Sequence, residues 1–400
     1  MAMDKQPARL LWDAGGLWSV MTWQACQDLG LPLKPISAAQ VAQGGLRGAG
    51  LLVVPGGWPS LKKQALGEAG CGQVRSFVEA GGRYLGFCGG AGLALAVSDG
   101  MGLVKLGRIP RAQRLPAASG PMWVEATQEG GGHALWQGLS GPLRLNVWWP
   151  GQFAATDEAP VTVLARYREP APGFCSADLK LDEQSQEDWA GLEEAYGMRL
   201  DPVLLRGEPA LIQALVGRGE AVLSYPHLDT PGSADGARCL GNLWRHWLGA
   251  EPGPAFPGLA RRLPAAEDLA SRAEELWREG LSLGLWQKRH PAMPLWRRGA
   301  RGLEIWSLVA LCRALAGAAG QEHESLVMRL AGELAPVWRE GSAALEAQAA
   351  LMDGDRPDPA GLAVLERWFP APRRTGGELG STLISLEKAL GLLLAGLNSP

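Results

Sequence analysis

Cys88 carries the strongest chemical signal in the chain. It ends the apolar segment YLGF, is followed directly by Gly89 and Gly90, and precedes a run of small residues that favours a helix. A strand, a tight turn and a helix in that order form a nucleophile elbow, which lifts one side chain above the edge of a sheet and needs glycine where the backbone is crowded. The sequence therefore predicts an exposed cysteine nucleophile at Cys88.

A cysteine nucleophile needs a base, and the chain has only five histidines. His227 follows the strand-like segment EAVLS across Tyr225 and Pro226, and Asp229 lies two residues further on. We predict a triad in which Cys88 attacks an acyl carbon and His227 accepts its proton and later protonates the leaving group. Asp229 would orient the imidazole ring and stabilise its charged form.

Backbone N–H groups near Cys88 are the expected oxyanion donors. The apolar segment LLVV ends in Pro55, Gly56 and Gly57, a turn that brings bare backbone to the end of a strand. We expect the N–H groups of Gly57, Trp58 and Gly89 to hold the oxyanion. Each such donor lowers a barrier by roughly 3 kcal/mol.

A pair of tryptophans supplies the expected substrate contacts. Trp148 and Trp149 are adjacent in the segment NVWWPGQF, so on a strand they face opposite sides. One would pack in the core, and the other would wall a pocket with Trp58; the alternative is that both serve sheet-to-helix packing. The candidate substrate-binding residues are Trp58, Trp148, Trp149, Gln152 and Tyr225.

The elements that must position these residues follow from the pattern before residue 250. Short apolar strands are expected at 9–12, 51–54 and 84–87, each followed by a turn and a helical pattern. Strands separated by helices imply a parallel sheet with helices on both faces, and ligands then bind at the carboxyl ends of the strands. Further strands are expected at 143–149, 161–167 and 220–224.

The chain is expected to divide near residue 250. Residues 251–264 hold four prolines and are interpreted as a linker between a domain at 1–250 and an all-α domain at 265–400. Leucines at helical spacing, at 326, 330 and 334 for example, predict a helical bundle there. The polar segment 168–202 is either a solvated loop with a short helix or a lid over the site.

Composition excludes several classes of protein. The net charge is −3 and there is no basic excess, which argues against nucleic acid as a partner. The six cysteines show no CxxC pair, so neither a metal site nor a disulfide framework is expected. We also expect no cofactor, no signal peptide and no membrane span, and therefore a soluble cytoplasmic protein.

Several motifs together resemble a known family. VVPGG, GFCGGA and SYPHLD, in this order, resemble the class I glutamine amidotransferase superfamily, whose triad has Cys at an elbow and His-x-Glu later in the chain. RLLWDAGG, LLVVPGGWP, GGRYLGFCGGAGLALA, LNVWWPGQF and GRGEAVLSYPHLD are closer still to the amidotransferase-like N-terminal domain of biotin protein ligases. The resemblance covers about residues 8–248 and implies an α/β, flavodoxin-like, three-layer parallel sheet.

The chain differs from that family in two residues and in the absence of one expected domain. Asp229 stands where the superfamily has Glu, and Gly92 stands where true glutaminases carry a Gln that holds the substrate. The ligase catalytic domain is missing, and no domain that uses ammonia is visible. Glutamine hydrolysis is therefore not the expected reaction.

Two functions follow from these residues. The leading prediction is a cysteine-dependent amidohydrolase or amidotransferase-like protein acting on a small amide or acyl substrate. The alternative is a catalytically silent binding or scaffolding module related to the biotin protein ligase N-terminal domain. In either case the helical domain is expected to dock a protein partner or a second copy of the chain.

Overall fold

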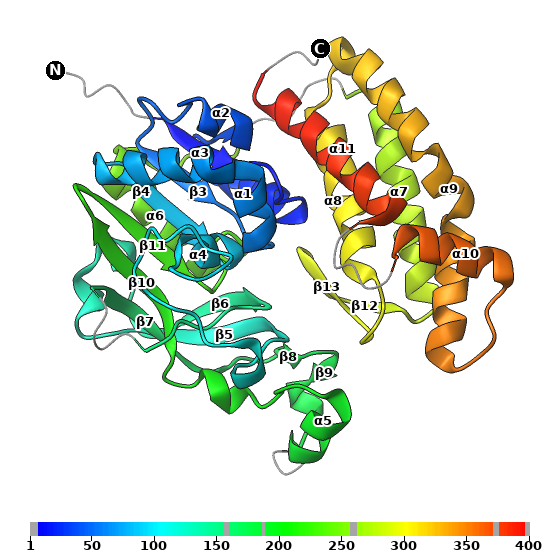
Figure 1. The fold of residues 1–400 in the computed structure, drawn as a ribbon, viewed down its shortest axis with the longest axis horizontal. Helices are drawn as coiled ribbons and strands as arrows, with labels where there is room; N and C mark the ends of the chain where they lie inside the picture. Colours follow the sequence, from blue (N-terminus) through cyan, green and yellow to red (C-terminus); the bar gives the residue numbers. More distant parts are fainter. Residues whose placement is uncertain (1–6, 156–159, 186–188, 257–261, 371–375, 397–400) are drawn as a thin grey trace. The chain divides into compact units, whose positions relative to one another are not determined.

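The structure is a computed structural model of the 400-residue chain. It describes residues 7–155, 160–185, 189–256, 262–370 and 376–396. The chain divides into two compact units, Met1–Phe256 and Pro257–Pro400 (Figure 1). The predicted linker at 251–264 spans this division, and its residues 257–261 lie outside the described residues.

A parallel sheet forms the centre of the first unit (Figure 1). Five neighbouring strands run parallel in the order β2-β1-β3-β4-β11. They are β2 (Lys34–Ile36), β1 (Ala8–Leu11), β3 (Leu51–Val54), β4 (Arg83–Phe87) and β11 (Gly219–Ser224). This is the flavodoxin-like strand order, so the predicted fold class is confirmed. All four residues of β3 are buried, as expected for a strand covered on both faces.

Antiparallel strands extend the sheet beyond β11. The order continues through β10, β7, β5, β8 and β9, and β6 pairs with β5. These strands are β10 (Pro209–Val216), β7 (Thr162–Pro170), β5 (Ala118–Ala126), β8 (Cys175–Ser176), β9 (Leu179–Lys180) and β6 (Leu143–Trp148). The sequence predicted β6, β7 and β11, but it did not predict β2, β5, β8, β9 or β10.

Helices cover the parallel strands. They are α1 (Leu17–Asp28), α2 (Ala38–Ala42), α3 (Pro59–Glu79), α4 (Gly89–Ala94) and α6 (Ala234–Leu248). Helix α5 (Trp189–Tyr196) lies beside β9 instead (Figure 1). The strand order runs one way from β1 to β2 and the other way from β3 to β4. Because parallel crossovers are right-handed, α1 and α3 lie on opposite faces of the sheet.

The carboxyl ends of β3, β4 and β11 meet at one edge of the sheet. The register places Val54 opposite Gly86 and Phe87 opposite Ser224. The Cys88 amide then donates to the Ser224 carbonyl at 2.7 Å, immediately after the two strands end. The turn at 55–58, the elbow at Cys88 and the segment 225–229 are therefore neighbours, although they are far apart in sequence.

The polar segment 168–202 contains more regular secondary structure than a loop would. It includes the end of β7, the small strands β8 and β9, and helix α5, while residues 186–188 lie outside the described residues. Strand β8 pairs with β5, so this segment is tied to the main sheet. Whether it covers the site stays a prediction.

The second unit is mainly helical. Its elements are α7 (Pro264–Ser282), β12 (Trp286–His290), β13 (Met293–Trp296), α8 (Gly302–Ala318), α9 (Glu324–Asp353), α10 (Pro359–Trp368) and α11 (Gly377–Leu394). Helix α10 begins after Asp358, whose side chain caps the amides of Ala360 and Gly361. Helix α9 continues through Pro336.

A small hairpin, β12–β13, is the element of the second unit that the sequence did not predict. Trp286 at its start stacks on Trp277 of α7, with ring centroids 4.7 Å apart, and its indole N–H donates to the Trp277 carbonyl at 2.9 Å. Met328 and Ile384 expose large apolar surfaces on α9 and α11. Docking of a partner or a second copy on this unit stays a prediction.

Candidate active site

The backbone at Cys88 has the geometry of a nucleophile elbow. Its φ of 45° and ψ of −99° lie outside the regular helix and strand regions, and such strain in a non-glycine residue is costly. A Cβ on Gly89 would lie 1.9 Å from the Gly57 carbonyl oxygen, and one on Gly90 would lie 2.1 Å from the Val54 carbonyl oxygen. Both positions therefore require glycine because two turns pack directly against each other.

The Cys88 side chain is less open than the sequence predicted. Its exposed fraction is 9%, and its sulfur contacts the carbonyl oxygens of Trp148 at 3.6 Å and Trp149 at 3.8 Å. Trp149 itself has a positive φ of 53°, which turns the chain immediately after β6. The sulfur is therefore covered by the segment that follows this strand.

His227 and Asp229 form a fully buried pair. Nδ1 of His227 lies 2.8 Å from Oδ1 of Asp229, and both side chains have no exposed surface. The Thr22 hydroxyl of α1 donates to the other carboxylate oxygen, Oδ2, at 2.5 Å. The His227 amide donates to the Asn146 carbonyl of β6 at 2.7 Å, so both ends of the residue are fixed.

Aromatic rings fix the plane of the His227 imidazole. Trp18 stacks on it with centroids 5.1 Å apart, and Phe87 of β4 lies at 6.5 Å. A Cβ on Gly56 would lie 2.7 Å from Cε1 of the imidazole. The ring therefore has little freedom to turn.

Burial alone would lower the pKa of His227, because it penalises the imidazolium form. The charge of Asp229 and the hydrogen bond to it act the other way, Cys88 adds to their effect, and the pKa is raised to about 9. Nε2 has no hydrogen bond of good geometry among the described residues, although the Cys88 sulfur is close enough to influence the ring. The structure thus brings Cys88, His227 and Asp229 together with one imidazole nitrogen still available.

Two of the three predicted oxyanion donors lie beside each other. The Gly57 nitrogen is 3.0 Å from the position that a Gly89 Cβ would take. Among the described residues, the backbone hydrogen bonds outside helices and strands use neither of these two N–H groups. Trp58, which precedes α3, is 39% exposed.

The predicted substrate-binding residues have different roles in the structure. Trp148 is 1% exposed and donates its indole N–H to Thr230, so it is a core residue that holds the loop after His227. Gln152 is 2% exposed, accepts from the Leu115 amide and donates to the Leu204 carbonyl. Its amide is therefore occupied in fixing loops.

Tyr225 and Trp149 remain near the sulfur. The Tyr225 hydroxyl is buried and has no hydrogen-bond partner among the described residues. Burial raises the pKa of Tyr225, and charge on Cys88 raises it further. The Trp149 ring lies 6.1 Å from Trp18 in an edge-to-face arrangement. Of these two side chains, Trp149 is half-buried, whereas Tyr225 is 1% exposed.

Sequence reasoning missed several residues of this region. They are Trp18, Thr22, Lys62, Arg108 and Arg114. Lys62 is completely buried and donates to the Ala14 carbonyl at 2.9 Å. The sequence has arginines at 108, 111 and 114, and this regular spacing could have pointed to Arg108 and Arg114.

The other cysteines do not compete with Cys88. All five are buried and unpaired, and burial raises the pKa of Cys26, Cys239 and Cys312. In the part of the chain that the structure describes, no group of His, Cys, Asp and Glu side chains is arranged to hold a metal ion. None of the helices described combines the length and apolar character needed to span a bilayer.

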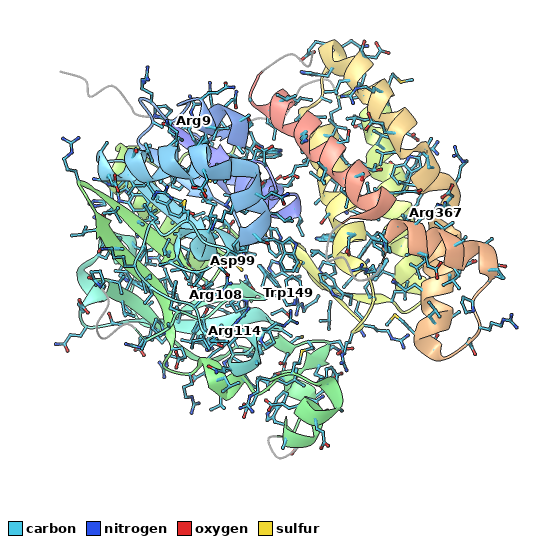
Figure 2. All side chains as sticks on the ribbon, viewed as in Figure 1. Arg9, Asp99, Arg108, Arg114, Trp149 and Arg367 are labelled. Carbon is cyan, nitrogen blue, oxygen red and sulfur yellow. The ribbon has the colours of Figure 1, made fainter. Side chains whose placement is uncertain are left out.

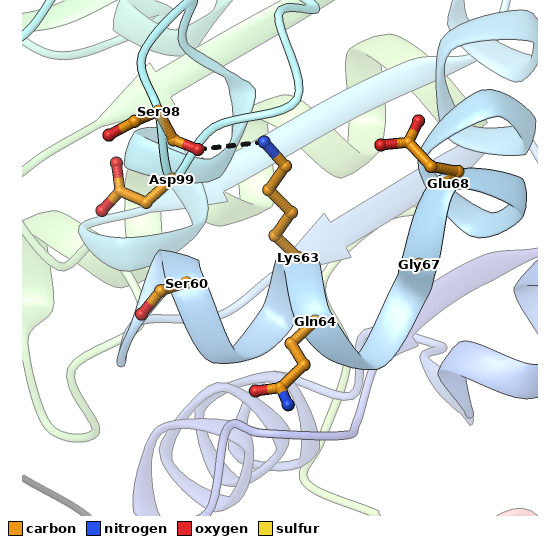
Figure 3. Close-up of a pocket in the computed structure, with 7 residues that line it drawn as sticks. All are labelled: Ser60, Lys63, Gln64, Gly67, Glu68, Ser98 and Asp99. Atoms are coloured by element: carbon orange, nitrogen blue, oxygen red, sulfur yellow. Dashed lines mark hydrogen bonds between the residues drawn. The ribbon is translucent and has the colours of Figure 1, made fainter. Parts of the chain in front are cut away.

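A separate hollow of about 440 Å³ lies on α3 (Figure 3). Its lining residues are Ser60, Lys63, Gln64, Gly67, Glu68, Ser98 and Asp99. Lys63 donates to the Ser98 carbonyl at 3.0 Å across it. The hollow does not include Cys88 or His227, and one of its lining residues, Asp99, binds Arg108.

Residues 35–97 match the family described as "Biotin-protein ligase, N terminal". This stretch includes the turn at Gly57 and the elbow at Cys88 and ends before His227. The resemblance to that family is thus confirmed over these residues. No curated protein sequence matches the chain.

Solved structures with a similar arrangement are distant. A putative GMP synthase protein from Thermoplasma acidophilum is 13% identical, with 60% of this chain and 92% of that chain covered and a TM-score of 0.38. A β-galactosidase from Rahnella sp. R3 is 15% identical over 60% of this chain and 31% of its own, with a TM-score of 0.36. A glutamine amidotransferase from Thermotoga maritima is 11% identical over 61% and 83%, with a TM-score of 0.35.

Proposed function

We propose that the first unit, an amidotransferase-like module, performs acyl transfer or amide hydrolysis with Cys88 as nucleophile. The strongest support comes from the hydrogen bonding of the two ring nitrogens of His227. Asp229 holds its Nδ1 atom at 2.8 Å, while Nε2 has no hydrogen bond among the described residues and lies close to the Cys88 sulfur. Nucleophilic catalysis needs a base that is held in this way, with one ring nitrogen fixed by a carboxylate and the other next to the thiol.

The proposed reaction has two steps. In the first, the Cys88 thiol proton passes to Nε2 of His227, and the raised pKa of the imidazole favours the resulting pair of thiolate and imidazolium. The sulfur then bonds to the acyl carbon, and the imidazolium gives the proton to the departing amine or alcohol. In the second, His227 removes a proton from water, the hydroxide attacks the thioester carbon, and the sulfur leaves with a proton. The products are a carboxylic acid and the free thiol.

The N–H groups of Gly57 and Gly89 are the proposed oxyanion donors. The backbones of these two residues are in direct contact at the elbow. Loss of one such donor costs about 10²–10³ in kcat in well-studied enzymes. The side chain of Lys62 lies next to this turn, since its Nζ is 3.6 Å from the position that a Gly57 Cβ would take.

A catalytically silent binding module is the second candidate function. It is favoured by the 9% exposure of Cys88 and by the contacts of its sulfur with two backbone carbonyls. A thiol that donates to a carbonyl oxygen is in its neutral form and must change partner before it attacks.

Turnover of activated acyl donors separates the two candidates. Wild-type protein should hydrolyse 4-nitrophenyl acetate and a panel of small 4-nitroanilides, and Cys88→Ala should abolish this activity. Cys71→Ala is the matched control, because Cys71 is also a buried thiol but lies in α3 away from His227. Equal turnover by the wild type and Cys88→Ala would support the silent module.

A further inference from the structure

Two arginines reach the elbow from different segments. The position four residues after Cys88 is Gly92, one helical turn away, where the Gly92 amide donates to the Cys88 carbonyl at 2.9 Å. A Cβ at Gly92 would lie 3.2 Å from Nη1 of Arg108 and 3.0 Å from Cγ of Pro59. The guanidinium of Arg108 therefore lies against the helix turn that begins at the nucleophile.

Arg114 approaches from the segment that covers the sulfur. Its Nη1 donates to the Pro150 carbonyl at 2.5 Å, and Pro150 follows the two tryptophans whose carbonyls contact Sγ of Cys88. The Nε atom of Arg114 is buried and has no hydrogen-bond partner among the described residues. Figure 2 shows Arg108, Arg114, Asp99 and Trp149 in the same part of the first unit.

The positive charge at this place is only partly balanced. Nη2 of Arg108 binds both oxygens of Asp99, at 2.8 and 2.9 Å, and within the described residues this is the acceptor paired with Arg108. Arg114 has a carbonyl oxygen but, in the described part of the chain, no carboxylate as partner. Burial lowers the pKa of Arg114, and the charges of Arg108 and Arg111 lower it further, as expected for a cationic group that lacks a counterion.

Two buried phenols complete the polar surroundings. The hydroxyl groups of Tyr167 and Tyr225 have no hydrogen-bond partner within the described residues. Both groups lie within electrostatic reach of Cys88, and Tyr225 is also within reach of both arginines. Burial raises the pKa of both phenols, so they stay protonated and can donate. A buried donor without an acceptor is costly, so such a group points to a missing acceptor.

We propose that the acyl donor of Cys88 carries a carboxylate, which Arg108 and Arg114 bind with the help of the Tyr225 hydroxyl. This inference rests on the proposed function of Cys88, but the charge selectivity can be measured without turnover. Guanidinium groups suit carboxylates because they present planar pairs of N–H donors. The guanidinium of Arg108 thus fills the space that a side chain at position 92 would occupy. Together with Arg114, it makes the site selective for an anion.

The experiment compares two alkylating reagents that differ in charge. Iodoacetate carries a carboxylate and iodoacetamide is its neutral analogue, so the ratio of their rates at Cys88 reports the local charge selectivity. The rates are followed by peptide mass spectrometry at low ionic strength, where charge effects are least screened. The proposal expects Arg108→Gln and Arg114→Gln each to lower this ratio at least about tenfold, the size expected for a charge-assisted hydrogen bond.

Matched variants control for charge and for folding. Arg144→Gln removes one exposed arginine elsewhere in the unit and should leave the ratio unchanged. Arg108→Lys and Arg114→Lys keep the charge and should retain most of the preference for iodoacetate. Asp99→Asn removes the competing carboxylate and should raise the ratio. Because this change is opposite to that expected for the glutamine variants, it tests the proposal even if a glutamine variant does not fold.

Two results would overturn the proposal. One is a ratio that is the same in the wild type, both glutamine variants and Asp99→Asn. The other is a Cys88 that neither reagent labels, because a two-carbon carboxylate could not then enter the site. If the ratio changes as expected while Cys88→Ala leaves ester turnover intact, the anion site stands and the proposed catalysis fails.

Discussion

The hydroxyl group of Thr22 donates a hydrogen bond of 2.5 Å to Oδ2 of Asp229, although the two residues are 207 positions apart in the chain. The other carboxylate oxygen of Asp229 binds Nδ1 of His227 at 2.8 Å. All three side chains are buried. Helix α1 therefore fixes the carboxylate that fixes the imidazole, and this chain of contacts directs Nε2 toward the nucleophile.

Thr22→Val should disturb the site through this contact. Valine matches the shape of threonine but leaves Oδ2 of a buried carboxylate without its donor, which costs about 1–3 kcal/mol in the free energy of unfolding. We expect slower alkylation of Cys88 by iodoacetamide as well, measured by peptide mass spectrometry. Ser19→Ala is the control, because Ser19 is a buried hydroxyl on the same helix that donates to the Trp12 carbonyl instead. Equal effects of both variants on the Cys88 rate would contradict the role of Thr22.

The raised pKa of His227 can be observed directly by NMR. In protein with ¹³C-labelled histidine Cε1, the resonance that disappears in His227→Gln should titrate with a midpoint near 9, as the pKa of about 9 predicts. Asp229→Asn removes the main favourable charge, so the midpoint should move downward, and burial should then hold it below the ordinary value of about 6.5. A wild-type midpoint below 6.5 would show that burial outweighs the carboxylate.

The same pKa makes stability depend on pH. Because the folded-state pKa lies above the unfolded value, the stabilisation is fully present below about pH 6.5 and is lost as the pH rises through about 9. The rise corresponds to about 3 kcal/mol in the free energy of unfolding of the first unit. Urea denaturation at pH 6 and pH 10 should therefore show a smaller difference in His227→Gln than in the wild type. A difference of the same size in both would contradict this linkage.

Gly89→Ala should collapse the elbow. Its Cβ would lie 1.9 Å from the Gly57 carbonyl oxygen, a backbone atom that cannot move without displacing the oxyanion turn. We expect a loss of several kcal/mol or no folded protein at all, measured by thermal unfolding. Gly72→Ala is the matched control, since a Cβ there meets nothing within 4 Å in the middle of α3. That variant should be neutral or stabilised by up to about 1 kcal/mol, and a Gly89→Ala protein as stable as Gly72→Ala would refute the close approach.

The six thiols should differ in reactivity. Burial raises the pKa of Cys26, Cys239 and Cys312, so at neutral pH these thiols should react with iodoacetamide far more slowly than Cys88. Timed alkylation followed by peptide mapping gives the order. Labelling of any of these three residues before Cys88 would contradict the assignment of Cys88 as the reactive thiol.

The sequence predicted the parallel strands β1, β3, β4 and β11, but not β2, because the signals of these four strands are local. Apolar runs such as LLVV, and the glycines that follow them, mark strand ends without reference to the rest of the chain. Strands β5 and β10 were missed for the same reason: Gly120 and Pro121 interrupt β5, and Pro209 begins β10. Proline and glycine inside or beside a strand remove the pattern on which the prediction depends.

The candidate site shows the same division between local and distant signals. Cys88, His227 and Asp229 lie in short motifs, so they could be proposed from the sequence alone. Thr22, Arg108 and Arg114 lie in segments whose approach to the elbow depends on how helices and loops pack, which no local pattern encodes. Trp148 was proposed as a ligand contact because adjacent tryptophans on a strand face opposite sides, but its indole N–H binds Thr230 inside the protein. The side-chain amide of Gln152, also proposed, binds Leu115 and Leu204.

The most direct test of the central claim is a search for an acyl group on Cys88. Wild-type protein is mixed with 4-nitrophenyl acetate, quenched in acid within the first turnover and mapped by mass spectrometry. The proposed mechanism predicts one acetyl group on Cys88 that hydroxylamine removes, and formation at least about 100-fold slower in His227→Gln, the scale of general-base catalysis. An adduct on another residue, or one that forms on Cys88 at the same rate without His227, would contradict the proposal that these two residues act together.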